Sequence, residues 1–156
     1  MLDRLLPSPV DNRVRGHKLA LWLFYPITLV SLVRSCIHIF RSDGGAQSIA
    51  TIPLDTFPPD AAVTLIGLFA QWGLSQLLMA ILFAVVLFRY RALLSLMYLL
   101  LLAENLGRVC IGAMKPIVTV ETPPGARFGF VMIILAILGL VLSLLWKEDP
   151  ARAKDD

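Results

Sequence analysis

The chain has 156 residues, of which 58% are hydrophobic and 16% are charged, and its formal net charge is +3. Soluble domains are about 25% charged, so this composition excludes an ordinary soluble domain and indicates an integral membrane protein. The small positive charge is explained by basic residues that flank membrane spans, and it gives no reason to expect a nucleic-acid partner.

Four long apolar runs follow one another along the chain, at about residues 19–40, 61–88, 92–113 and 128–146. Each run reaches the roughly 20 residues that an α-helix needs to cross a bilayer. The sequence therefore predicts an all-α fold, a four-transmembrane-helix bundle that forms a single integral membrane domain over residues 1–156. The connections 41–60 and 114–127 become the outer loops. The second run is longer than a bilayer requires, so we expect it to tilt or to project.

Basic residues beside the spans predict the orientation, because Lys and Arg are retained on the cytoplasmic side. Nine of them fall on the side of the two termini, namely Arg4, Arg13, Arg15, Lys18, Arg89, Arg91, Lys147, Arg152 and Lys154. Three fall on the opposite side, namely Arg41, Lys115 and Arg127. We therefore expect cytoplasmic N and C termini in a multi-pass protein of the bacterial cytoplasmic (inner) membrane. The first run exceeds the 7–15 apolar residues of a signal peptide, so it should remain as an anchor.

Polar side chains within the spans are predicted to form one layer in the outer half of the membrane. With about 1.5 Å of rise per residue, these side chains lie about 18–25 Å from the cytoplasmic edge. An arginine or carboxylate at the centre of a span costs about 2.5–3.5 kcal/mol, so the layer should face the bundle interior. The predicted polar pocket consists of Arg34, His38, Gln71, Gln76, Glu104, Asn105 and Arg108.

Several roles are open for this pocket. An ion pair between Glu104 and an arginine would fix the register of the helices, and the arginine left over would hold an anion. Catalysis is disfavoured, because the sequence contains none of the usual nucleophile, metalloprotease or phosphate-loop motifs. The leading hypothesis is a non-enzymatic accessory or ligand-binding protein whose pocket holds a membrane lipid, a quinone-like molecule or a small anion. The alternative is a subunit of a quinone- or thiol-linked membrane oxidoreductase or of a small-solute transporter, in a homo- or hetero-oligomer.

The two cysteines, Cys36 and Cys110, lie at similar predicted depths near the outer surface. The preferred interpretation is two small core residues, since unbonded cysteine is commonly buried. A disulfide that acts as a redox pair, or a metal site that also uses His38, are the alternatives. One histidine and two cysteines do not make a convincing ligand set, so no metal is predicted.

Two further segments have predicted roles in packing. Small or flexible residues recur along the fourth run in a seam that allows close helix packing, namely Gly125, Gly129, Met132, Ala136, Gly139 and Ser143. This pattern predicts a scaffold helix, and a homodimer contact is the less favoured use of the same seam. The outer loop 41–60 is interpreted as a flexible connection. The alternative is a lid, because Ile49, Ile52, Leu54 and Phe57 would let the loop fold back over the bundle.

The order of these features resembles the small DoxX-like bacterial membrane proteins. The resemblance covers roughly residues 19–146 and depends on Arg34 late in the first span, a second span with Gly67, Trp72 and Gly73, a basic turn, and Glu104-x-x-x-Arg108 followed by Gly112 and Pro116. It implies a four-helix membrane protein. Most such proteins have no assigned function, and some are associated with quinone-linked or thiol oxidation. The resemblance implies no catalytic residues here.

Overall fold

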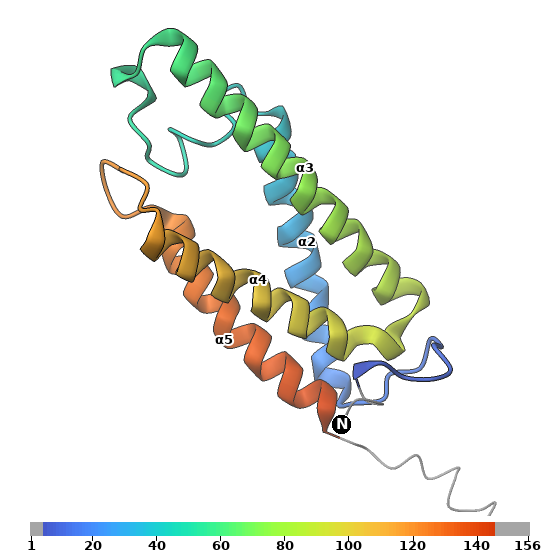
Figure 1. The fold of residues 1–156 in the computed structure, drawn as a ribbon. Coiled ribbons are helices and arrows are strands. Elements are labelled where there is room, and N and C mark those ends of the chain that lie inside the picture. The colour runs from blue at the N-terminus through green and yellow to red at the C-terminus, as the bar shows by residue number, and fades with distance from the viewer. Residues whose placement is uncertain (1–4, 146–156) are drawn as a thin grey trace, which may run out of the picture.

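The computed structural model describes residues 5–145, and this part of the chain is helical with no strand (Figure 1). Its elements are α2 (Lys18–Phe40), η1 (Leu54–Thr56), α3 (Pro59–Arg89), η2 (Arg91–Leu93), α4 (Leu94–Met114) and α5 (Pro124–Leu144). Four helices are long and apolar enough to cross a membrane, counting η2 and α4 as one. The predicted all-α fold with four spanning helices is therefore confirmed.

The predicted boundaries of the first three spans agree with the structure to within two residues. The fourth helix begins earlier than predicted, at Pro124 instead of residue 128. Proline is well suited to the first position of a helix, because the amide hydrogen that it lacks would have no partner there. Pro59 begins α3 in the same way. The predicted end of the fourth span, Trp146, lies outside the described residues.

The helices are arranged as two pairs. α3 packs closely on α2 and α4 packs closely on α5, and α2 also packs on α5, whereas α3 and α4 make little direct contact. We call the end with the N-terminal segment, the α3–α4 turn and the end of α5 the proximal end, and the opposite end the distal end. In Figure 1 the two pairs diverge toward the distal end, and α3 projects there beyond the other helices.

Tyr98 lies at the centre of the proximal core. Its ring is fully buried and packs edge-on against Phe24, which in turn packs against Phe83, at centroid distances of 4.9 and 5.1 Å. The Tyr98 hydroxyl donates a 2.7 Å hydrogen bond to the carbonyl oxygen of Ala20, so a polar group ties α4 to α2 inside an apolar cluster. Gly139 of α5 lies directly against the Tyr98 ring and leaves no room for a Cβ.

The predicted packing seam of α5 exists only in part. Met132, Ala136, Gly139 and Ser143 are buried, as that pattern requires. In contrast, a Cβ at Gly125 or Gly129 would meet no neighbouring atom within 4 Å. The small residues therefore permit close packing near the proximal end, where the pairs meet, and have no such role where the pairs diverge.

The long loop between α2 and α3 folds back on the bundle. Ala46, Ile52 and Leu54 are buried with Phe69 of α3 in a second, smaller apolar cluster. Thr51 also links this loop to the α4–α5 loop. Its carbonyl oxygen accepts a 2.9 Å hydrogen bond from the Val120 amide, and its hydroxyl donates a 2.8 Å bond to the Glu121 carbonyl. The structure agrees with the alternative interpretation, in which the loop folds back on the bundle, because burial of Ala46, Ile52 and Leu54 against Phe69 favours a packed arrangement.

The carboxylate of Asp43 holds the first turn of this loop. It accepts hydrogen bonds from the amides of Gly45 and Ser48, at 2.9 and 2.7 Å. Partial burial alone would raise the pKa of Asp43, but the hydrogen bonds from Ser48 and Gly45 and the positive charge of Arg41 lower it from 3.8 to about 2. The ionised carboxylate therefore stabilises the loop above pH 3.8, and this contribution is lost as the pH falls toward 2.

Hydrogen exchange will test this contribution. Between pH 4 and pH 2 the amides of Gly45 and Ser48 are expected to lose protection against exchange, because protonated Asp43 no longer accepts both bonds. The variant Asp43→Asn should show weak protection at every pH in this window. Protection that stays constant in the unmodified protein down to pH 2 would contradict the assignment.

Candidate functional site

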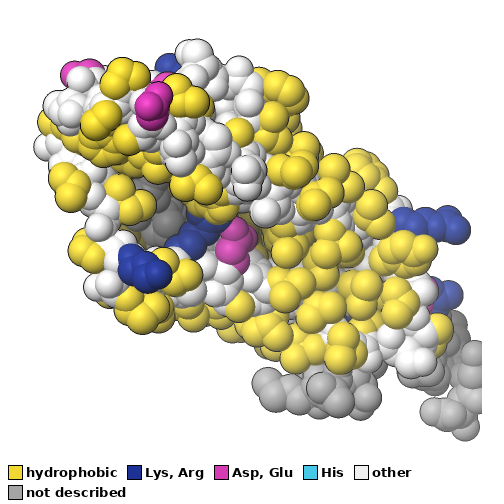
Figure 2. Space-filling model, turned by 45° about the horizontal axis from the view of Figure 1, so that its top comes forward, with side chains coloured by type: hydrophobic (Ala, Val, Ile, Leu, Met, Phe, Trp, Pro, Cys, Tyr) yellow, Lys and Arg dark blue, Asp and Glu magenta, His cyan; other side chains and the backbone are white. Residues whose placement is uncertain are grey.

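A cleft lies where the two helix pairs diverge, and all four spanning helices contribute to its walls. It encloses about 440 Å³, counted out to its open mouth. Figure 2 shows it as a hollow on the face of the molecule, with dark blue basic and magenta acidic side chains inside. Its lining residues are Val30, Ser31 and Arg34 of α2, Gln76, Met79, Ala80 and Phe83 of α3, Leu101, Glu104, Asn105 and Arg108 of α4, and Phe128 and Met132 of α5.

Two arginines and one glutamate line this cleft. Arg108 forms a hydrogen-bonded ion pair with Glu104, one helical turn away on α4. The amide of Gln76, oriented with its oxygen toward the donors, accepts hydrogen bonds from Arg108 at 3.2 Å and from the indole nitrogen of Trp72 at 3.0 Å. Arg108 is thus tied both to its own helix and to α3 of the other pair.

Trp72 is the aromatic centre of the site. The guanidinium carbon of Arg108 lies 4.7 Å from the centroid of its ring, and that of Arg34 lies 5.5 Å away. Both distances are within the range of cation–π attraction, which tryptophan provides better than other side chains. The two cations therefore approach one another beside a single ring, although they come from different helix pairs.

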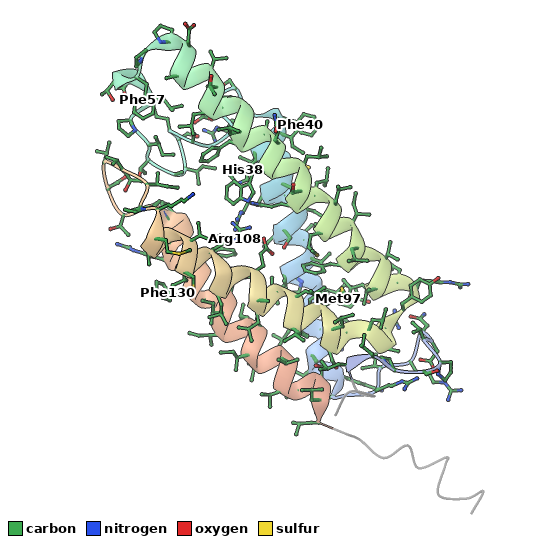
Figure 3. All side chains as sticks on the ribbon, viewed as in Figure 1. His38, Phe40, Phe57, Met97, Arg108 and Phe130 are labelled. Carbon is green, nitrogen blue, oxygen red and sulfur yellow. The ribbon has the colours of Figure 1, made fainter. Side chains whose placement is uncertain are left out.

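His38 supports Trp72 and the loop rather than the cleft itself. Its ring is buried and lies 4.8 Å from the Trp72 ring, and Nδ1 donates a 2.8 Å hydrogen bond to the carbonyl oxygen of Gly44. This close approach of α2 and α3 depends on Gly73, where a Cβ would lie only 2.7 Å from the Cβ of His38. Figure 3 shows His38 and Arg108 on facing sides of the space between the pairs.

The structure brings five of the seven predicted pocket residues into the cleft lining, namely Arg34, Gln76, Glu104, Asn105 and Arg108. His38 lies beside Trp72, outside the lining. Gln71 is exposed and does not line the cleft, because a step of five residues from Gln76 turns the helix by about 140°. Its place in the pocket was wrongly predicted.

The two cysteines are free thiols, and both are exposed. The preferred interpretation as core residues is therefore wrong. Each lies two residues from an arginine of the cleft, and two residues correspond to about 200° of turn, which points the thiol away from the cleft. Any role of Cys36 and Cys110 as a redox pair remains a prediction.

Two features of the site were not predicted as such. Trp72 was noted only as part of the second span, although its spacing of four residues from Gln76 places both on one helix face. That spacing is the signal that would have identified it. α5 was interpreted as scaffold, yet Phe128 and Met132 form part of the cleft wall.

The site combines guanidinium, carboxylate and amide groups with an aromatic ring, at the wide end of a bundle of apolar helices. Comparisons with protein-family models, curated proteins and solved structures returned no match. The chemistry of the cleft must therefore carry the functional argument. Guanidinium groups form strong paired hydrogen bonds with carboxylates and phosphates, so the arrangement is suited to bind an anion.

Proposed function

We propose that this chain is a non-enzymatic integral membrane protein that binds a small anionic ligand in its cleft. One observation carries the proposal. Arg34 and Arg108 both lie within 5.5 Å of the Trp72 ring centroid, while Glu104 is the one acidic side chain among the residues that line the cleft. The site therefore has an excess positive charge that an anion would neutralise.

The energy of an unpaired cation supports this proposal. Glu104 pairs with Arg108, whereas Arg34 forms no hydrogen bond or salt bridge within residues 5–145. An unpaired arginine inside a membrane span costs about 2.5–3.5 kcal/mol, and its contact with Trp72 offsets only part of this. A bound anion between Arg34 and Arg108 would offset the rest.

We also propose the orientation and location of the protein. Arg13, Arg15, Lys18, Arg89 and Arg91 lie at the proximal end, against Arg41, Lys115 and Arg127 at the distal end. This bias favours a cytoplasmic proximal end, and hence a cleft in the outer half of a bacterial inner membrane. Membership of the DoxX-like proteins remains a proposal that the order of polar residues supports.

Native mass spectrometry after gentle extraction tests the binding function. The unmodified protein is expected to carry a ligand adduct that Arg34→Gln reduces at least tenfold, because the substitution removes the unpaired cation. Arg127→Gln provides the matched control. It removes the same charge from an exposed position outside the cleft lining, so the adduct should persist. A mass without adduct in the unmodified protein, or equal loss in both variants, would contradict the proposal.

A further inference from the structure

The cleft has a polar end and an apolar end. α2 and α4 run from the proximal to the distal end, and α3 and α5 run back. The charged and amide side chains of the lining therefore occupy its distal part, namely Arg34, Gln76, Glu104, Asn105 and Arg108. Except for Ser31, the lining side chains nearer the proximal end are apolar, namely Val30, Met79, Ala80, Phe83, Leu101 and Met132.

The depth of the polar end matches that of lipid headgroups. Arg34 lies six residues before the end of α2, and Arg108 lies six residues before the end of α4. At 1.5 Å of rise per residue, both lie about 9 Å inside the distal ends of their helices. Long arginine side chains at this depth reach toward the interface. The apolar end then lies at the depth of the acyl chains, so the polarity of the cleft has the same direction as that of a lipid in the distal leaflet.

The cleft also opens toward the side of the bundle. α3 and α4 make little direct contact, and in Figure 1 α2 is visible between them. Figure 2 shows the hollow opening on this face. A ligand that enters between α3 and α4 comes from the bilayer itself and never has to leave it.

We infer that the occupant is a membrane lipid with a carboxylate or phosphate headgroup, which enters between α3 and α4 from the distal leaflet. The headgroup binds Arg34 and Arg108, and the chain follows the apolar wall past Met79 and Phe83. The space of about 440 Å³ includes the open mouth of the cleft, so the cleft is a shallow site and does not enclose a whole lipid. It leaves room for a headgroup and the start of one chain, with the remainder of the lipid in the bilayer. This inference rests on the proposed anion-binding function and goes beyond it by naming the ligand class.

Fluorescence of Trp72 provides a direct test, because the chain has three tryptophans and one of them lies in the site. In the variant Trp22→Phe/Trp146→Phe, Trp72 is the sole tryptophan. In detergent micelles, 5-doxylstearate is expected to quench it saturably, because its nitroxide lies close to the headgroup. The uncharged methyl ester at the same mole fraction should quench weakly and without saturation. Arg34→Gln should raise the half-saturating concentration of the acid at least tenfold, and Arg127→Gln should leave it unchanged.

Competition distinguishes a lipid from a soluble anion. Palmitate and lysophosphatidate are expected to displace 5-doxylstearate, whereas acetate and inorganic phosphate should fail to do so at a thousandfold higher concentration. Displacement by the soluble anions at concentrations similar to palmitate would overturn the lipid inference and leave the anion-binding function intact. Equal quenching by the acid and its ester would also overturn it. In that case, an adduct that the unmodified protein carries and Arg34→Gln loses in native mass spectrometry would show that the anion-binding function survives. If the unmodified protein carries no adduct, both the anion-binding function and the lipid inference are rejected.

Discussion

Replacing Gly139 with alanine is expected to lower the free energy of unfolding by about 2–3 kcal/mol. The new Cβ would overlap ring carbons of Tyr98, and the ring cannot move freely because it is fully buried and its hydroxyl bonds to Ala20. Overpacking of a well-packed core typically costs about 1–3 kcal/mol. Here the displaced ring would also lose the hydrogen bond that ties α4 to α2.

Gly129→Ala is the matched control on the same helix. A Cβ at Gly129 meets nothing within 4 Å, and alanine has a higher helix propensity than glycine. This variant should therefore be as stable as the unmodified protein or slightly more stable. Unfolding by SDS titration measures both variants. If Gly139→Ala and Gly129→Ala unfold at the same detergent fraction, the close packing between α5 and Tyr98 is wrong.

The second large effect is expected at the ion pair. Glu104→Leu leaves Arg34 and Arg108 beside the same ring without a carboxylate, which should destabilise the protein by about 3 kcal/mol. Arg108→Leu should cost less, about 1–2 kcal/mol, because Arg34 lines the same cleft and remains available to Glu104. Adding Arg108→Leu to Glu104→Leu removes one stranded cation, so the double variant should recover about 2 kcal/mol relative to Glu104→Leu.

A double-mutant cycle measures this coupling. Asp11 and Arg15 provide the comparison, since they are also four residues apart but lie in the N-terminal segment with a longer separation of 3.8 Å. The side chains of this pair are about as accessible as those of Glu104 and Arg108, but they precede α2 and lie outside the spanning helices, where water screens them. Their coupling energy should therefore not exceed about 0.5 kcal/mol, as is usual for pairs in water. Additive losses at Glu104 and Arg108 would reject the view that the two charges depend on one another.

The sequence alone was sufficient for the spans and for the depth of the polar residues. Apolar length predicts membrane-crossing helices, because a helix of about 20 mostly apolar residues matches the thickness of the hydrocarbon core. Rise per residue then placed Arg34, Gln76, Glu104 and Arg108 at one level, and the structure brings these four side chains together in one cleft. Depth along a helix depends on residue number, so it needs no tertiary information.

Direction around the helix axis was predicted less well. Gln71 shares the predicted depth of the layer, yet it is exposed, and Cys36 and Cys110 are exposed as well. Which face of a helix meets a neighbour depends on how the helices cross, and the apolar residues of a membrane helix surround it on all sides. Hydrophobic periodicity, which identifies the inner face of a helix in a soluble protein, therefore gives little help here.

The packing of the loops could not be predicted from the sequence either. The order of the α2–α3 loop depends on Phe69, which lies ten residues inside α3, and on the Thr51 contact with Val120 and Glu121. Such partners are distant in sequence and carry no motif. Only the folded chain shows that the two loops at the distal end meet.

The divergence of the two helix pairs has a mechanical consequence. At the proximal end the two pairs pack together through the aromatic cluster around Tyr98. At the distal end Thr51 joins them by two hydrogen bonds to the α4–α5 loop. Spreading the distal ends requires the loss of these two bonds, at about 1 kcal/mol each, and also of the contacts of Arg108 with Gln76 and Trp72. The separation of the two pairs is therefore held at two levels, by Thr51 in the loops and by Arg108 in the cleft.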